Sequence, residues 1–210
     1  MAKVDEAGSP PALRVGLTGG MASGKTLVAA MLEVCGAPVA FADQMARGIM
    51  EHPGPVRDRL EGLLGAEAYT ATGQLDRAQL GKRLFADPSL LAEVNAIVHP
   101  AVGEAARAWH EQHAGTAPYT IYESALLFEA DVAQEFDVVV LVHAPRAERL
   151  RRAMARDGAE ESVVVARLDA QWTDEQRLAQ SAYLILNDGS APLISQVWRL
   201  HRGLVGRETA

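Results

Sequence analysis

The chain has 210 residues, a formal net charge of −7 and one cysteine. Hydrophobic residues make up 49% of it, which is enough for a sizeable core and excludes a disordered chain. The acidic balance argues against general nucleic-acid binding, so an anion-binding site has to be local. The single cysteine, Cys35, excludes an intramolecular disulfide. Because there is no membrane-length apolar run and no signal-peptide pattern, we expect a cytoplasmic protein that binds neither membranes nor nucleic acid.

Glycine and proline punctuate the N-terminal half of the chain. Gly8, Pro10 and Pro11 discourage regular structure, so residues 1–12 are predicted to form a loose leader. Gly36 is well placed to end a helix. The elements predicted in this half are a strand at 13–18, a helix at about 24–35, a strand at 38–41, loops at 53–55 and 71–73, helices that open at Asp76 and at 87–89, and a helix from His99 to about His113.

The C-terminal half is rich in strand-forming residues. Residues 137–145 read DVVVLVHAP, a continuous apolar run that suits a strand buried on both faces. The elements predicted here are strands at 119–123, 138–142 and 183–186, an arginine-rich helical region at 146–180 and a closing helix at 192–205. Strands that alternate with helices predict an α/β fold of three layers around a mainly parallel, five-stranded sheet. Such sheets bind ligands at the carboxyl ends of their strands.

Residues 19–26 read GGMASGKT and fit the phosphate-loop pattern G-x-x-x-x-G-K-[ST]. Small residues let the backbone fold around phosphate oxygens, and amide groups at the helix start donate to those anions. Lys25 adds a charge for the β- and γ-phosphates, and Thr26 offers a hydroxyl to magnesium. The nucleotide-binding residues predicted here are Gly20, Met21, Ala22, Ser23, Gly24, Lys25 and Thr26. A glycine turn beside a surface lysine is the alternative, but the motif follows an apolar strand and opens a helix, as nucleotide binding requires.

A phosphate loop alone does not choose a reaction. Nucleotide-hydrolysing switches, motors and small-molecule kinases all use one. The guanine-reading pattern N-K-x-D is absent, and the length leaves room for a core, a substrate insert and a short lid. These features favour a small-molecule kinase.

Several segments together resemble the dephospho-CoA kinase family, from about residue 13 to 197. In chain order they read GLTGGMASGKT, FADQMAR, LDRAQLGKRLF, IVHPAV, ALLFE, RDG followed by ARLDAQ, and ILNDG. The resemblance implies transfer of the γ-phosphate of ATP to the ribose 3′-hydroxyl of dephospho-CoA, which gives CoA and ADP in the last step of CoA synthesis. It also implies a nucleotide-kinase core at 13–53, 114–145 and 180–210, a helical CoA-binding insert at 54–113 and an arginine-rich lid at 146–179.

Asp43 is the candidate catalytic carboxylate. It follows the predicted strand at 38–41, near where a parallel sheet presents its ligands, and can accept the proton of the attacking hydroxyl. Its match to the last aspartate of the family's DAD pattern supports this role, and a helix cap is the alternative. Arg47 matches an arginine of the same segment and is expected to hold the substrate, with a surface-helix arginine as the alternative.

Three further residues are candidate substrate ligands through the resemblance. Arg77 in LDR matches the CoA-side domain and suits pairing with a phosphate. His99 in HP matches that domain too, and capping at a helix start is its alternative. Glu123 ends a strand where phosphate-loop proteins often place an acid near magnesium, although the family usually has aspartate there.

Residues 146–156 carry five arginines against one acid, which suits a polyphosphate; a solvated helix face is the alternative. Arg156 best matches the family's lid arginine and is the candidate for stabilising the transferring charge. Arg167 and Gln171 match the second lid helix, where packing is their alternative role. Asn187 matches the turn near the adenine, and a plain Asn-Asp-Gly turn is its equal alternative.

Phe41, Ala125 and Arg149 depart from the family pattern, in which an aspartate, a proline and commonly a glutamine stand. They leave open another phosphate-loop kinase acting on a nucleoside or other small alcohol. A non-catalytic nucleotide-binding protein is the alternative from a different class, and Lys25 and Asp43 argue against it. The histidines show no metal-ligand spacing, so no zinc site is expected. The nucleotide chemistry instead implies ATP as co-substrate and magnesium. The sequence does not indicate an oligomeric state.

Overall fold

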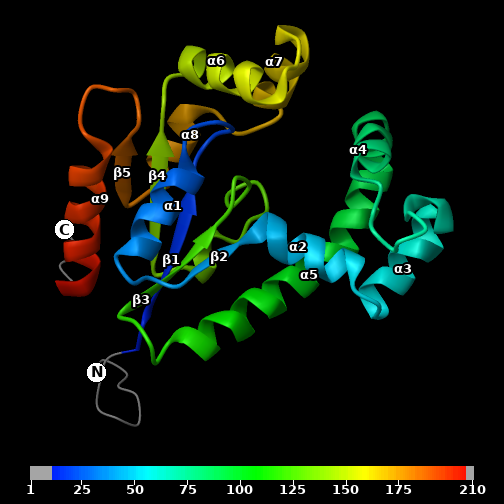
Figure 1. Cartoon of the computed structure of the whole chain (residues 1–210), viewed down its shortest axis with the longest axis horizontal. Coiled ribbons are helices and arrows are strands. Elements are labelled where there is room, and N and C mark those ends of the chain that lie inside the picture. The colour runs from blue at the N-terminus through cyan, green and yellow to red at the C-terminus, as the bar shows by residue number, and fades with distance from the viewer. Residues whose placement is uncertain (1–10, 207–210) are drawn as a thin grey trace. The chain divides into compact units, whose positions relative to one another are not determined.

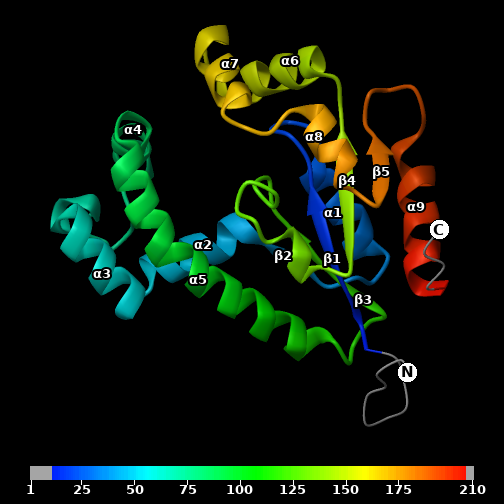
Figure 2. The ribbon, with the colours of Figure 1, turned by 180° about the vertical axis from the view of Figure 1, so that it is seen from behind.

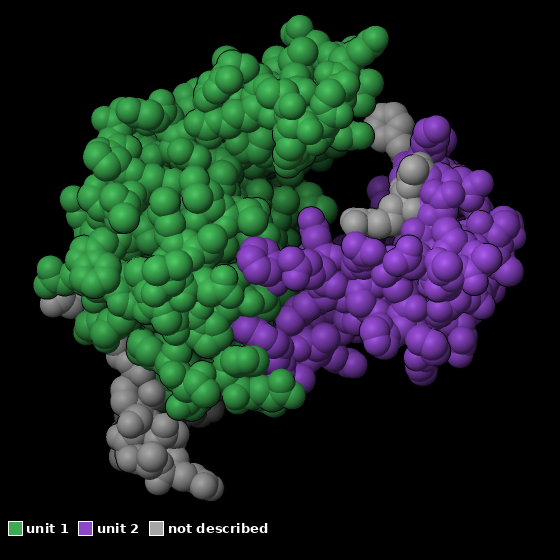
Figure 3. Space-filling view, in the orientation of Figure 1, with its two compact units in different colours: residues 1–40, 110–210 green, residues 41–109 purple. Residues whose placement is uncertain are grey.

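The computed structural model describes residues 11–206, apart from the side chains of Arg77, Ala78 and Phe85. The predicted leader therefore lies almost entirely outside the described residues. The chain divides into two compact units (Figure 3). The first, the core unit, joins Met1–Ala40 to His110–Ala210, and the second, the inserted unit, is Phe41–Trp109.

A five-stranded sheet forms the centre of the core unit (Figure 1). Its strands are β1 (Leu13–Thr18), β2 (Val39–Phe41), β3 (Tyr119–Glu123), β4 (Val138–His143) and β5 (Tyr183–Leu186), in the order β2-β3-β1-β4-β5. β1 pairs in parallel with both β3 and β4, and β4 with β5. The predicted parallel sheet is confirmed. Five of the six residues of β4 are buried, as its unbroken apolar run predicts.

Helices cover both faces of this sheet. α1 (Lys25–Val34) and α9 (Leu193–Gly206) pack together on one face, and α8 (Asp174–Ala179) packs against β4 on the other (Figures 1 and 2). α9 buries Val197, Leu200 and Leu204, which recur at the helical spacing from which this helix was predicted. Gly36 ends α1 in the left-handed conformation, as expected. The predicted three-layer α/β architecture is therefore confirmed.

The arginine-rich region contains two further helices, α6 (Arg146–Asp157) and α7 (Glu161–Asp169). They pack together through a small apolar cluster of Ala153, Val164 and Leu168. Gly158 ends α6 with a left-handed backbone conformation, which allows the chain to reverse into α7. The RDG segment is thus the end of α6, and its glycine begins the turn to α7.

The inserted unit is built from α2 (Ala42–Glu51), α3 (Pro55–Leu64), a 3₁₀ turn (Ala66–Ala68), α4 (Arg77–Ala86) and α5 (Pro88–His113), whose last residues belong to the core unit. Asp76 caps α4 by accepting from the Gln79 amide, as predicted. The loop predicted at 53–55 instead leads directly into α3, with Pro55 in its first turn, where a proline costs no hydrogen bond.

The prediction that a helix begins at His99–Pro100 is wrong. Both residues lie inside α5, which begins at Pro88. A proline inside a helix removes one backbone hydrogen bond and tends to kink or break it. Here Val94, Ile97, Val98 and Val102 bury an apolar stripe that continues across the proline, and this burial keeps the helix intact.

Candidate active site

The loop from Gly19 to Gly24 connects β1 to α1 and has a backbone that few side chains tolerate. Gly19, Ala22 and Gly24 all have positive φ angles, of 155°, 60° and 98°. A Cβ on Gly19 would lie closer than 3.0 Å to the Val142 carbonyl oxygen. The glycines therefore have a steric reason to be there, because the loop passes directly over the carboxyl end of β4.

Lys25 is the first residue of α1, and it is only 8% exposed. Its Nζ lies 3.4 Å from the Gly20 carbonyl oxygen and 3.9 Å from Glu123 Oε1 at the end of β3. The loop thus curls around its own lysine, and the acid expected near magnesium lies beside it. Thr26 follows in the first turn of α1 and is exposed. The structure brings together the predicted phosphate-binding lysine, the threonine and Glu123.

The start of α1 is open to an anion. The N-cap residue, Gly24, has no side chain, and the first turn carries no acid. The amide groups there point out of the helix and carry its positive dipole end. Ser23 Oγ and Thr18 Oγ1, at the two ends of the loop, are buried and find no hydrogen-bond partner within residues 11–206. Buried hydroxyls without partners are costly, so this loop is suited to a ligand that supplies acceptors.

Asn187 ties the end of β5 to the loop. Its side-chain Nδ2 donates to the Ser23 carbonyl oxygen at 2.8 Å, and its backbone amide donates to the His143 carbonyl oxygen at 2.7 Å. Its backbone carbonyl oxygen accepts a hydrogen bond from Arg152 Nη2 at 2.9 Å. The side-chain donor is therefore used to brace the phosphate loop, a role that the sequence did not reveal.

The arginines of α6 are mostly held by nearby acids. Arg151 and Arg152 both donate to Glu148. Their hydrogen bonds, of which the Arg151 bond has the larger effect, lower the pKa of the Glu148 carboxyl to about 2. Arg156, the candidate lid arginine, is 61% exposed at its side chain and donates to Asp157 at 2.7 Å. That bond lowers the pKa of Asp157. In this structure Arg156 is held by its neighbour on the helix.

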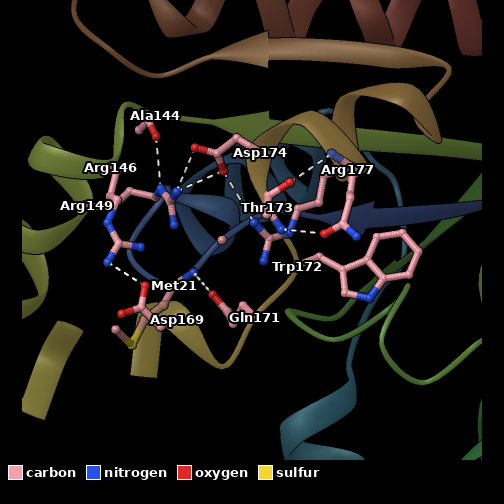
Figure 4. A network of polar contacts seen from close by, with 12 residues as sticks. Met21, Ala144, Arg146, Arg149, Asp169, Gln171, Trp172, Thr173, Asp174 and Arg177 are labelled. Carbon is pink, nitrogen blue, oxygen red and sulfur yellow. Dashed lines mark hydrogen bonds and ion pairs between the residues drawn. The ribbon is translucent and has the colours of Figure 1, made fainter. Parts of the chain in front are cut away.

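Arg149 behaves differently from the other arginines of α6, because it is buried. Its Nε donates to the Ala144 carbonyl oxygen at 2.9 Å, and its Nη2 donates to both carboxylate oxygens of Asp174 at 2.8 Å (Figure 4). A Cβ on Gly20 would overlap Arg149 Nη1, so the guanidinium lies directly against the phosphate loop. Arg177, also buried, donates to Asp174 and to Glu129.

Four of the predicted site residues belong to the inserted unit. Asp43 is in the first turn of α2, is exposed, and forms no hydrogen bond or ion pair with any described residue. Arg47 lies one turn later and donates through Nε to Glu51 at 3.1 Å. Arg77 begins α4, and its side chain is outside the described part of the chain. His99 is exposed and lies inside α5 rather than at a helix start, so the capping alternative for it is wrong.

A family model and a sequence relative of this chain point to the same family. A family model described as "Dephospho-CoA kinase" matches residues 13–192. A dephospho-CoA kinase of Bacteroides fragilis is 36% identical over 189 residues, which are 90% of this chain and 91% of the relative. The chain belongs to the dephospho-CoA kinase family.

Solved structures have the same fold. A dephospho-CoA kinase from Campylobacter jejuni superposes with a TM-score of 0.71 at 19% identity, over 93% of this chain and 98% of that one. A protein described as TT1252 from Thermus thermophilus gives a TM-score of 0.79 at 31% identity, over 95% and 99% of the two chains. The dephospho-CoA kinase family therefore accounts for nearly the whole chain, and the nucleoside-kinase alternative is not favoured.

Sequence reasoning named Gln171 but did not reveal the contacts that support the loop from behind. Gln171 Oε1 accepts from the Met21 amide at 2.8 Å, and Glu129 Oε1 accepts from the Trp172 amide at 2.9 Å. These contacts join residues more than 40 positions apart, so no local pattern predicts them. The available signals were Gln171, which matches the second lid helix, and Arg149, an arginine where the dephospho-CoA kinase pattern commonly has glutamine.

Two searches of the described residues gave negative results. None of the described helices is long and apolar enough to cross a membrane. Within the same residues, no group of three or more histidines, cysteines or carboxylates is arranged to hold a metal ion.

Proposed function

We propose that this chain transfers the γ-phosphate of ATP to the ribose 3′-hydroxyl of dephospho-CoA, giving CoA and ADP in the last step of CoA biosynthesis. This is the reaction of the family to which the chain belongs. The observation that carries it at the site is the buried Lys25 within an open, glycine-shaped anion loop at the start of α1. We place the reaction in the cytoplasm, where both substrates are available.

The nucleotide side of the reaction uses the loop at residues 20–26. Its backbone amides bind the phosphates, apart from the Met21 amide, which already donates to Gln171, and Lys25 neutralises charge on the β- and γ-phosphates as the transfer proceeds. The closeness of Lys25 Nζ to the Gly20 carbonyl and to Glu123 supports this role, because the oxygen atoms of both residues partly compensate the buried ammonium. Asn187 supports the loop itself through the hydrogen bond from its Nδ2 to the Ser23 carbonyl oxygen.

The acceptor side uses Asp43. Its carboxylate accepts the proton of the 3′-hydroxyl while that oxygen attacks the γ-phosphorus, and the bond from phosphorus to the β–γ bridging oxygen breaks. The position of Asp43 in the first turn of α2, without a partner among the described residues, leaves it available for this work. Arg47, Arg77 and His99, all in the inserted unit, hold dephospho-CoA.

Magnesium fits the residues present. Thr26 and Glu123 offer the hydroxyl and carboxylate oxygens that this ion prefers. A site of one or two protein ligands completed by water and phosphate is also its usual arrangement, and needs no cluster of carboxylates. When bound with ATP, the ion supplies charge neutralisation on the phosphate oxygens.

The division of labour between segments is part of the proposal. The inserted unit overlaps residues 54–113 and binds dephospho-CoA, whereas residues 146–179 act as the lid. For Arg156 to stabilise the transferring phosphoryl group, it has to exchange Asp157 for a phosphate oxygen. Closure of the lid then excludes water, which would otherwise accept the phosphoryl group.

A panel of acceptors tests the proposal. Initial rates of ADP formation are measured with dephospho-CoA, with adenosine and with water alone, at saturating magnesium-ATP. We expect rapid turnover with dephospho-CoA only. Comparable or faster turnover with adenosine would contradict the assignment of the acceptor, and binding of ATP without turnover on any acceptor would contradict catalysis.

A further inference from the structure

Residues 20–22 of the phosphate loop are each contacted from the α6–α8 region. Arg149 of α6 lies against Gly20, and the Met21 amide donates to Gln171 Oε1 at 2.8 Å. The side chains of Met21 and Ala22 pack against the apolar cluster that joins α6 to α7. The tip of the loop is therefore supported from outside as well as by its own contacts at the Gly20 carbonyl oxygen.

Gln171 lies between α7 and α8, and the residues that follow it are held firmly. The Trp172 amide donates to Glu129, and the Trp172 ring stacks on Phe128 with centroids 5.3 Å apart. Two residues later, Asp174 accepts both hydrogen bonds from Arg149 Nη2 (Figure 4). The position of Gln171 is thus fixed by contacts at Trp172 and Asp174.

The Arg149–Asp174 pair is built for a fixed geometry. The Arg149 guanidinium is 4% exposed, and it bonds to the Ala144 carbonyl oxygen as well as to the carboxylate. A buried guanidinium that donates to a carbonyl oxygen through Nε and to a carboxylate through Nη2 has few favourable orientations, unlike an exposed ion pair. Arg149 thereby links the carboxyl end of β4 to the start of α8, with the phosphate loop against its face.

We propose that Gln171 is a positioning residue of the phosphate loop, and that the buried Arg149–Asp174 pair holds Gln171 in place. The inference rests on the proposed function, because it concerns how the ATP site is shaped. Binding of a triphosphate requires the loop amides to be oriented beforehand, and a glycine-rich loop loses much entropy when it is ordered. Gln171 fixes the Met21 amide, so that less of this entropy is lost when ATP binds.

Removal of the acceptor on Gln171 tests the proposal. Gln171→Met keeps the length and apolar packing of the side chain but cannot accept the Met21 hydrogen bond, and Gln171→Ala removes both. We expect each to raise the Kd for ATP about fivefold, the worth of one neutral hydrogen bond. The KM for dephospho-CoA should not change. The matched control is Gln176→Met, which disrupts the Thr173–Gln176 capping box in the same segment without touching the loop.

The control separates positioning from stability. Gln176→Met should lower the melting temperature and leave the Kd for ATP as in the wild type. An increase of less than about twofold in the Kd for Gln171→Met would overturn the proposal. So would a control variant that weakens ATP binding as much as Gln171→Met, because segment stability alone would then explain the effect.

The buried pair has its own test. Asp174→Asn leaves the Arg149 guanidinium buried without its carboxylate, so it should weaken ATP binding at least as much as Gln171→Met. Arg149→Gln removes the buried charge. The double variant Arg149→Gln with Asp174→Asn should therefore bind ATP more tightly than Asp174→Asn alone. If the losses of ATP-binding free energy in the two single variants simply add in the double variant, the link between the buried pair and the loop is overturned.

Calorimetry with ATP and no acceptor keeps this result separate from the proposed function. A wild-type protein that binds ATP but forms no CoA would contradict the proposed reaction and would leave the binding comparison valid. A wild-type protein that forms CoA, with Gln171 variants that bind ATP normally, would contradict only the positioning role.

Discussion

Substitution of Gly24 by alanine perturbs the phosphate loop at a sterically constrained point. Gly24 has a φ angle of 98°, a region that an L-residue enters at a cost of about 1–2 kcal/mol. The new Cβ would also lie closer than 3.0 Å to Asn187 Nδ2, which donates to the Ser23 carbonyl oxygen. Loss of that hydrogen bond costs about 1 kcal/mol more. The total is about 2–3 kcal/mol.

This loss has two measurable consequences. At about 2–4 °C per kcal/mol for a chain of this size, the melting temperature should fall by about 4–12 °C. If the loop instead relieves the strain by changing shape, ATP binding should weaken by about tenfold or more, since 1.4 kcal/mol is a factor of ten. Differential scanning calorimetry and isothermal titration with ATP measure the two effects on the same sample.

Gly62→Ala is the matched control for this substitution. Gly62 lies inside α3, and a Cβ there meets no atom within 4 Å. Because alanine favours a helix and restricts the unfolded chain, it should stabilise by up to about 1 kcal/mol. A Gly24→Ala protein with wild-type melting temperature and wild-type affinity for ATP would refute the geometry given for the loop and for Asn187.

Three further substitutions test other parts of the molecule. Asp43→Asn should lower kcat by about 10²- to 10⁴-fold with little change in the Kd for ATP, and near-normal turnover would show that Asp43 is not the base. Arg177→Met leaves Glu129 without its buried cation, so thermal denaturation should show a loss of about 3 kcal/mol, whereas unchanged stability would contradict that contact. Arg156 holds the pKa of Asp157 below 3.8, so Asp157 stabilises the fold at neutral pH and this contribution is lost as the pH falls through the lowered pKa. The stability difference between wild type and Asp157→Asn should therefore shrink below about pH 4, and a difference that persists undiminished to about pH 2 would count against the pair.

The sheet and the phosphate loop were predictable from sequence because their signals are local. The strands at 13–18, 119–123 and 183–186 match the structure at both ends, since each is a short apolar run with clear flanking residues. The phosphate loop needs glycine at specific backbone angles, and this requirement appears directly as GGMASGKT. Local steric demands leave a readable pattern in the sequence.

Long-range burial explains what the sequence did not reveal. The start of α5 was predicted correctly, but a second helix was wrongly predicted to begin at His99 because Pro100 is a helix-breaking signal, whereas the apolar stripe that overrides it is recognised only from its packing. The buried network of Arg149, Asp174 and Gln171 was missed for a related reason. Charged and amide side chains are usually exposed, and their burial here depends on helices that are distant in sequence.

The reaction itself gives the most direct test of the account. Purified protein is incubated with magnesium-ATP and dephospho-CoA, and the products are quantified by mass spectrometry beside the Lys25→Ala variant. The account predicts CoA and ADP in equal amounts from the wild type and almost none from the variant. A folded wild-type protein that binds ATP but forms no CoA would contradict it.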